Sequence, residues 1–169
     1  MPIGYDIGTT CDKSCVMSLF NKKKDPGYFT VEQQAEIVQA IKTAETATSG
    51  EIRLYVEGRC KYVDALDRAK EVFDELHMYE TASRNGVLIY LAMKDRQLAV
   101  FGDEGIHQKV GLDFWKQKLQ QVKELFRVEA YGSGLKLIIL SIGDALKSAF
   151  PYDKINDINE LPDDIVYGK

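Results

Sequence analysis

The chain has 169 residues, 45% of them hydrophobic, and a formal net charge of -4. This length and composition are typical of one soluble domain that buries a sizeable core. Because the charge is nearly balanced and no broad basic face is visible, we expect no nucleic-acid partner, and no stretch approaches the roughly 20 apolar residues that cross a membrane.

Residues 1–27 are expected to form a flexible arm, part of which resembles a vector-encoded spacer ahead of Met17. A first helix is predicted to begin at Thr30, which forms a capping-box pattern with Gln33. Apolar residues then follow at helical spacing up to the TSG turn at 48–50. The spacing of apolar residues changes in EIRLYVEGR, where apolar and polar residues alternate. This alternation predicts a strand with one buried face.

A second helix, capped by Asp64, is predicted from a single apolar stripe, and the RNG turn at 84–86 introduces the apolar run VLIYLAM. An uninterrupted apolar run between turns is typical of a strand covered on both faces, so we expect it in the middle of the sheet. A KDR turn then returns the chain through QLAVFG as a hairpin neighbour. Two more helices follow, with apolar stripes that begin at Leu112 and Leu135.

The last residues, 151–169, form an acidic tail that nevertheless keeps several aliphatic side chains. Fully solvated tails rarely keep so many, so this segment is predicted either to strap across the domain or to dock on a partner. The sequence therefore indicates one α/β domain over residues 28–150, between the arm and the acidic tail.

The predicted order is helix, strand, helix, strand, strand, helix, helix, which indicates a three-layer α/β/α sandwich with a small mixed sheet. A right-handed crossover makes the first two strands parallel, and the hairpin makes the third antiparallel to the second. We therefore expect the starts of the first two strands and the end of the third to meet at one edge of the sheet. Polar residues in these loops are Glu51, Arg84, Asn85, Asp103 and Glu104.

Several of these side chains carry oxygen atoms that suit a hard cation. Calcium takes about six to eight oxygen ligands, commonly carboxylates and carbonyls from flexible loops. The predicted ligands of a divalent cation, calcium ahead of magnesium, are Asp103, Glu104, Glu51 and Asn85. Backbone groups and water would complete the coordination shell.

Each predicted ligand also has a purely structural explanation. Asp103 could cap a short helix that starts near Glu104, where the helix dipole favours an acid. Glu51 could simply face solvent. Asn85 and Gly86 could form a turn that needs a positive φ angle. The sequence leaves both sets of roles open.

Arg84 and His107 are predicted to bind an anion or to support the metal ligands. Arg84 could hold a phosphate through its two-pronged guanidinium, or it could pair with Asp103. His107 could act as an acid or a base, because imidazole side chains in general titrate near neutral pH, although one histidine on a helix usually has a structural role. The sequence contains no nucleophile elbow, Walker loop, zinc-protease helix or Rossmann glycine fingerprint, so no conventional catalytic set is present.

The segments TSGEIRLYV and RNGVLIYLAMKDRQLAVFGDEGI, with the helix after them, resemble the TPM domain family over about residues 28–150. The resemblance implies a small sheet between helices, a loop site for a divalent cation such as calcium, acid phosphatase activity in some members, and frequent export or membrane anchoring. Two features depart from the common pattern. The paired aspartates that many members carry before the first helix are reduced here to Asp25, and the usual glycine-rich end of the third strand reads GDEGI.

From this resemblance we expect a divalent-cation-binding accessory or interaction module with an unidentified protein partner, serving the assembly or maintenance of a membrane complex. The alternative is a metal-dependent acid phosphatase of low intrinsic activity, in which the cation polarises a phosphoryl oxygen and a carboxylate positions water. The odd number of cysteines cannot form a complete disulfide framework, and this favours a reducing compartment. We expect a cytoplasmic protein without a transmembrane segment of its own.

Overall fold

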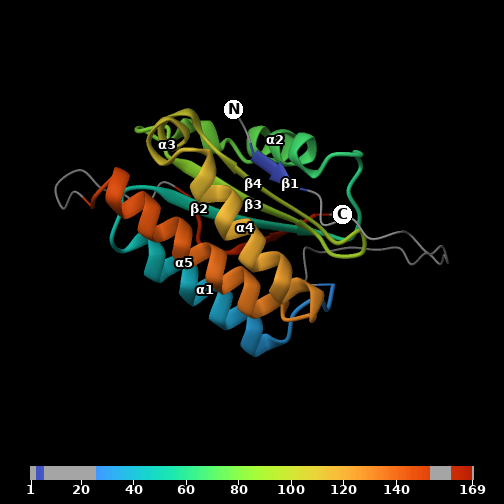
Figure 1. The fold of residues 1–169 in the computed structure, drawn as a ribbon. Coiled ribbons are helices and arrows are strands. Elements are labelled where there is room, and N and C mark those ends of the chain that lie inside the picture. Colours follow the sequence, from blue (N-terminus) through green and yellow to red (C-terminus); the bar gives the residue numbers. More distant parts are fainter. Residues whose placement is uncertain (1–2, 6–25, 153–160, 169) are drawn as a thin grey trace.

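The computed structural model describes residues 3–5, 26–152 and 161–168. Its helices are α1 (Val31–Glu45), α2 (Ala65–Glu75), the short 3₁₀ helix η1 (Met78–Glu80), α3 (Glu104–Val110), α4 (Leu112–Arg127) and α5 (Tyr131–Ala149). Its strands are β1 (Ile3–Tyr5), β2 (Glu51–Glu57), β3 (Gly86–Ala92), β4 (Gln97–Gly102) and β5 (Ile165–Tyr167). Figure 1 shows how these elements are arranged.

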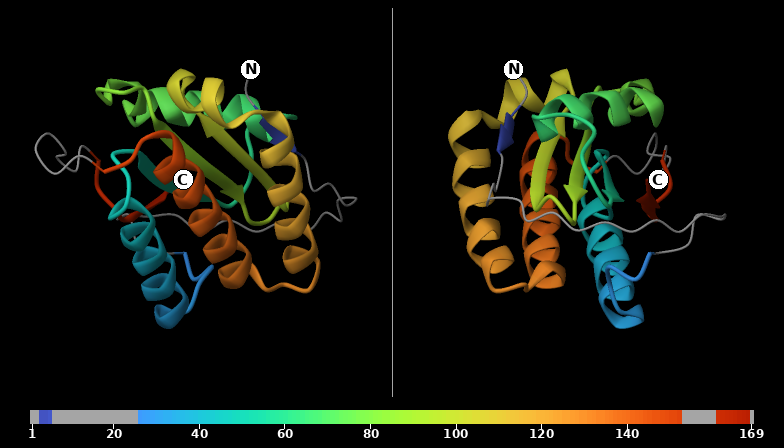
Figure 2. Two further views of the ribbon diagram at one scale, coloured as in Figure 1. Left: turned by 60° about the vertical axis from the view of Figure 1, so that its left-hand side comes forward. Right: turned by 90° about the vertical axis from the view of Figure 1, so that its right-hand side faces the viewer.

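The described strands form one mixed sheet in the order β1, β4, β3, β2, β5. β2 pairs in parallel with β3, and β4 pairs antiparallel to β3, as the crossover and the hairpin predict. Helices α1, α4 and α5 cover one face of the sheet, whereas α2 covers the other (Figures 1 and 2). The predicted three-layer α/β/α sandwich with a mixed sheet is therefore confirmed.

Four short elements lie outside the predicted order. β1 comes from the predicted arm and pairs antiparallel to β4, and β5 comes from the predicted tail and pairs in parallel with β2. The other two are η1, which follows α2, and α3, which separates β4 from α4. Strands this short cannot be recognised from an alternating pattern, because they contain too few residues to display a period. Residues 1–2 and 6–25 of the predicted arm, which include Met17 and Asp25, lie outside the described residues.

The predicted starts of α1 and α2 are confirmed by their capping hydrogen bonds. The amide of Gln33 donates to Thr30 Oγ1 (3.2 Å), and the amide of Thr30 donates to Gln33 Oε1 (2.9 Å). At the start of α2, the amide of Leu66 donates to Asp64 Oδ1 (2.8 Å). These bonds satisfy amide groups that the first turn of a helix leaves without a backbone partner.

Strand β2 is buried differently from the prediction. The alternating pattern predicted one buried face, but all seven residues of the strand are buried. Helix α2 covers the polar face, where Arg68 Nε lies 3.0 Å from Glu57 Oε1. The single-face prediction is wrong because Tyr55 and Glu57 on the polar face contact the buried Arg68 of α2 instead of facing water.

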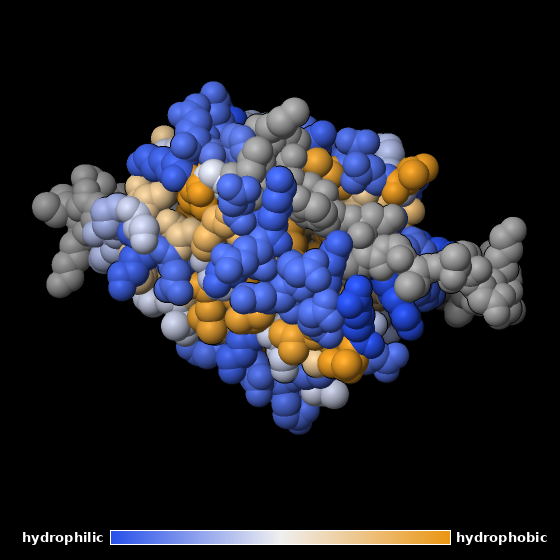
Figure 3. All heavy atoms as spheres, viewed as in Figure 1, coloured by the Kyte–Doolittle hydropathy of each residue, from blue (hydrophilic) through white to orange (hydrophobic). Residues whose placement is uncertain are grey.

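The sheet separates two hydrophobic clusters. The larger lies between the sheet and helices α1, α4 and α5 and includes Trp115, and the smaller lies beneath α2 and includes Phe73. On the face drawn in Figure 3, hydrophilic side chains predominate and hydrophobic ones form separate patches. None of the described helices combines the length and the apolar character that crossing a membrane requires.

Candidate functional site

The predicted meeting of three loops at one sheet edge is present in the structure. Parallel pairing places Glu51 of β2 opposite Gly86 of β3, and antiparallel pairing places Val87 opposite Gly102 of β4. The amide of Asp103, just after β4, donates to the carbonyl of Gly86 (2.9 Å). The starts of β2 and β3 and the end of β4 therefore form a continuous edge, as the strand directions predict.

Asp103 uses its carboxylate for two structural contacts. Arg84 Nε donates to Oδ2 (2.6 Å), and Arg84 Nη2 donates to Oδ1 (2.8 Å), so the two side chains form a bidentate ion pair. The amide of Glu104 also donates to Oδ1 (2.7 Å), which caps the start of α3. Asp103 is only 4% exposed. The structural roles that the sequence left open for Asp103 and Arg84 are thus the roles seen.

Asn85 joins the loops before β2 and β3. Its side chain is fully buried, and Nδ2 donates to the carbonyl of Ser49 (3.0 Å). Its Oδ1 has no hydrogen-bond partner among the described residues. The positive φ angle considered for Asn85 and Gly86 lies instead one residue earlier, at Arg84, where φ is 50°. Asn85 therefore fixes the position of the Ser49 carbonyl beside the start of β2.

Glu104 and His107 lie on α3, which starts immediately after the edge. Glu104 is exposed, and its Oε1 accepts a hydrogen bond from Gln108 Nε2 (3.4 Å). His107 is half-buried, and its backbone amide donates to the carbonyl of Asp103 (3.0 Å). Neither residue lines the pocket formed at the start of β2.

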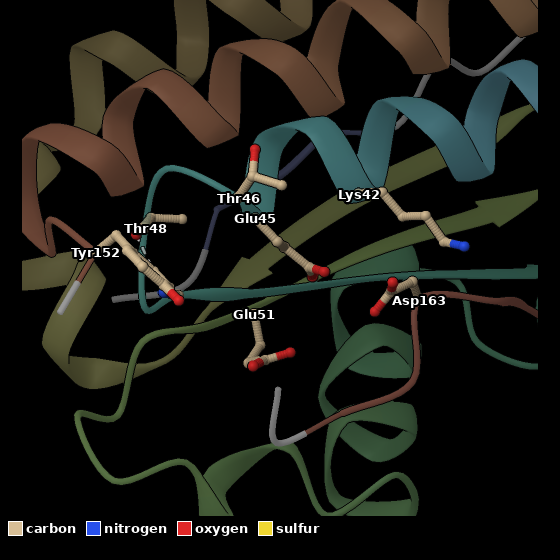
Figure 4. A pocket seen from close by; sticks show the side chains of 8 residues that line it. Lys42, Glu45, Thr46, Thr48, Glu51, Tyr152 and Asp163 are labelled. Atoms are coloured by element: carbon tan, nitrogen blue, oxygen red, sulfur yellow. Dashed lines mark hydrogen bonds between the residues drawn. The ribbon is translucent and has the colours of Figure 1, made fainter. Parts of the chain in front are cut away.

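A pocket of about 550 Å³ opens beside the start of β2, on the side away from β3. It is lined by Lys42, Glu45, Thr46, Thr48, Gly50, Glu51, Tyr152 and Asp163. Figure 4 shows the Glu45 and Asp163 side chains pointing toward one another, with Glu51 extending from the other side of the β2 ribbon. Of the four predicted metal ligands, Glu51 alone lines this pocket.

The carboxyl group of Glu45 is the most strongly perturbed group of the pocket. Burial raises its pKa to about 8, and the nearby charges of Glu51 and Asp163 act in the same direction. The amide of Ile52 donates to Glu45 Oε1 (2.8 Å), which partly opposes this shift. Glu51 is itself only 4% exposed, so the expectation that it could face solvent is not met. Glu45 accordingly holds a proton at neutral pH.

No three His, Cys, Asp or Glu side chains in the described ranges are already arranged to hold a metal ion. A cation in the pocket would therefore need the side chains of Glu45, Glu51 and Asp163 to move closer together. These acids come from three elements, the end of α1, the start of β2 and the segment before β5. Carboxylates that come from separate elements can adjust independently, as a flexible coordination shell requires.

Sequence reasoning missed Glu45 and Asp163. Glu45 ends α1 and resembles an ordinary exposed acid in a helix, because the sequence does not reveal that its carboxylate turns toward Ile52. Asp163 belongs to the tail, whose position depends on how β5 pairs with β2. The usable signal was the number of aliphatic residues in that tail, which predicted contact with the domain but gave no position.

Replacing Asp103 with alanine is expected to reduce the free energy of unfolding by about 2 kcal/mol, because the change removes a helix cap and one half of an ion pair. Glu104→Ala is the matched control, since this neighbouring acid is exposed, and we expect it to change stability by less than about 0.5 kcal/mol. Urea unfolding measures both values. Equal losses in the two variants would contradict the structural role of Asp103.

Comparison with known proteins agrees with this fold. The sequence matches the TPM domain over residues 23–145. The NMR structure of the BA42 protein from the psychrophilic bacterium Bizionia argentinensis is 39% identical, covers 87% of this chain and 100% of that chain, and superposes with a TM-score of 0.78.

A more distant likeness, to the N-terminal domain of the cg2496 protein from Corynebacterium glutamicum, is 12% identical, covers 79% of this chain and 88% of that chain, with a TM-score of 0.57. At this identity the likeness concerns the fold alone. Comparison with curated proteins gives no match. The domain match includes strands β2 to β4, helices α1 to α4 and most of α5. The chain therefore belongs to the TPM domain family.

Proposed function

We propose that this TPM domain binds a divalent cation, calcium ahead of magnesium, and acts as an accessory or interaction module. The observation that carries the proposal is the pocket beside β2, where Glu45, Glu51 and Asp163 gather from three elements around about 550 Å³. Acids that line one pocket repel one another when they are ionised, and a cation bound between them would remove that repulsion.

The proposed ligands differ in part from those the sequence predicted. Glu51 remains, whereas Asp103 is engaged by Arg84 and Glu104 is exposed on α3. Glu45 and Asp163 take their places as carboxylate ligands. Asn85 would support the site from its other side, because it holds the backbone at Ser49, two residues before Glu51.

Calcium suits this pocket better than magnesium. Magnesium demands near-ideal octahedral geometry with short bonds, whereas calcium accepts a larger and less regular set of oxygen ligands. The side chains of the pocket are separated and must move to bind an ion, and backbone carbonyls and water would complete the shell. A calcium ion must also displace the proton held by Glu45, so binding should strengthen as the pH rises toward about 8.

The proposal is tested by the melting temperature of chelator-treated protein with and without calcium. At a free calcium concentration about 100 times the dissociation constant, binding should add about 2.7 kcal/mol of stability and raise the melting temperature by several degrees. Glu51→Gln should abolish the shift. Glu104→Gln is the matched control, because Glu104 was predicted as a ligand but lies outside the pocket, and it should leave the shift unchanged. A wild-type melting temperature that does not change when calcium is added would refute the proposal.

A phosphatase that uses the same cation is the second candidate, and one observation favours it. Lys42 lines the pocket together with the three acids, so a phosphate bound to the cation would find a positive charge nearby. Hydrolysis of p-nitrophenyl phosphate should be measured with calcium, with magnesium and with chelator. Cation-dependent turnover that is lost in Glu51→Gln would favour the enzyme over the module, whereas calcium binding without turnover would favour the module.

A further inference from the structure

The strand β5 occupies a position beside β2 that the TPM domain match does not include. The match ends at residue 145, whereas β5 covers Ile165–Tyr167. Apart from β5, no described strand lies on this side of β2. A long buried strand with an open edge would expose unpaired backbone groups, which favour pairing with another extended segment. In this chain a segment from beyond the matched domain fills that position.

The contacts of β5 show what the β2 edge accepts. The paired residues are Leu54 with Ile165, Tyr55 with Val166 and Val56 with Tyr167. The amide of Gly168 also donates to the carbonyl of Val56 (2.8 Å). Ile165 and Tyr167 pack against the larger hydrophobic cluster, and Val166 packs against the cluster beneath α2. The edge therefore accommodates three successive apolar side chains, directed alternately to the two faces of the sheet.

A positive charge, that of Arg53, lies beside this edge next to the start of β5. Arg53 Nη2 lies 3.4 Å from Asp164 Oδ1, and the Arg53 side chain is 9% exposed whereas that of Asp164 is 73% exposed. Arg53 belongs to β2, so its positive charge would remain beside this edge if the tail left. In this chain an acidic residue, Asp164, lies beside Arg53 immediately before the apolar triplet.

The tail is held on β2 by fewer contacts than β3 is. Three residues of β5 pair with β2, whereas seven residues of β3 do so on the other side. All three side chains of β5 are only half-buried. An ion pair with one exposed partner contributes about 0–1 kcal/mol. A segment with so few contacts opens locally at a free energy well below that of global unfolding.

We infer that the β2 edge is a binding groove for an extended segment of another protein, in which an acidic residue is followed by three apolar residues. Residues 164–167 occupy this groove within the same chain and compete with the partner. Backbone pairing would supply affinity. The alternating apolar contacts, together with the positive charge of Arg53, would supply specificity. The inference rests on the interaction-module part of the proposed function, but it does not require a bound cation.

The test removes the tail from the groove without altering β2. Ile165→Asp combined with Tyr167→Asp should prevent β5 from docking, and a fluorescent peptide with the sequence of residues 161–168 then serves as the probe. Fluorescence anisotropy in the presence of chelator should show binding to this double variant about ten-fold tighter than to the wild type, where the tail competes. The chelator removes calcium, so peptide binding measured in its presence does not depend on the proposed cation site. Peptide binding can therefore be observed even if the protein binds no calcium.

Two controls define the specificity of the groove. A peptide that carries aspartate in place of the isoleucine and tyrosine should not bind the double variant. Val128→Asp, at a residue 73% exposed and distant from β2 in sequence, should bind the probe as the wild type does. A double variant that is folded by circular dichroism but does not bind the probe would overturn the inference. A concentration-dependent dimer that exchanges tails would also overturn it, since the occupant would then be a second copy of this chain.

Hydrogen exchange in the unaltered protein provides a second measurement that does not depend on the folding of a variant. The Gly168 amide, which bonds to Val56, should exchange on the order of 100-fold faster than amides in the middle of β3, such as Ile89. Equal protection at the two positions would show that the tail leaves only when the whole domain unfolds, and this would contradict the groove.

Discussion

Replacing Arg68 with methionine is expected to lower the free energy of unfolding by about 3–5 kcal/mol, because a buried carboxylate then loses its charge partner. Arg68 and Glu57 have side chains only 2% and 1% exposed, and Arg68 Nη2 lies 3.2 Å from Glu57 Oε2 in addition to the contact through Nε. The Tyr90 hydroxyl also donates to Glu57 Oε1 (2.6 Å). The carboxylate therefore cannot escape to water without disrupting the packing beneath α2.

Urea unfolding at neutral pH measures this loss. Arg127→Met is the matched control, because Arg127 Nη1 pairs with Glu124 Oε1 (2.9 Å) at the surface, where both side chains are more than half exposed. The control should lose less than about 1 kcal/mol. Adding Glu57→Gln to Arg68→Met should restore part of the stability, since no buried charge then remains unpaired. Equal losses for Arg68→Met and Arg127→Met would contradict the importance of the buried pair.

Glu45→Gln is expected to change how stability depends on pH. The folded-state pKa of Glu45 is about 8, and the ordinary value is 4.5, so between these values the folded protein holds a proton that the unfolded chain releases. The free energy of unfolding is therefore highest below the ordinary pKa and falls as the pH rises toward about 8. The slope is at most about 1.4 kcal/mol per pH unit. Glutamine does not titrate and retains an oxygen that can accept from the Ile52 amide.

Urea unfolding at a series of pH values from about 5 to about 9 tests this expectation. The wild type should lose stability across this range more steeply than Glu45→Gln, and at the upper end the variant should be the more stable protein. Glu36→Gln, on the exposed side of the same helix, should follow the wild-type profile. Parallel profiles for wild type and Glu45→Gln would show that Glu45 does not carry the extra proton.

The sheet edge could be predicted because its geometry follows from local rules. The capping box at Thr30, the uninterrupted apolar strand β3 and the short turn before β4 each determine an element or a strand direction from a few neighbouring residues. Strand directions then place Glu51, Gly86 and Gly102 along one edge without any knowledge of side-chain positions.

The side-chain contacts at that edge could not be predicted in the same way. Arg84 pairs with Asp103 from a backbone with a φ angle of 50°, a conformation that the sequence does not specify for an arginine. Glu45 turns toward β2 because the Ile52 amide lies within reach, and this is known only once α1 packs on the sheet. Asp163 enters the pocket through the register of β5, a strand too short to leave a pattern.

Calcium titration of the ¹⁵N-labelled, chelator-treated protein, followed by NMR, tests the cation proposal most directly. We expect the amide signals of Glu45, Glu51 and Asp163 to shift together and to saturate, while those of Glu104 and His107 on α3 remain nearly unchanged. Spectra that do not respond to calcium, or shifts confined to α3, would contradict a cation site in the pocket beside β2.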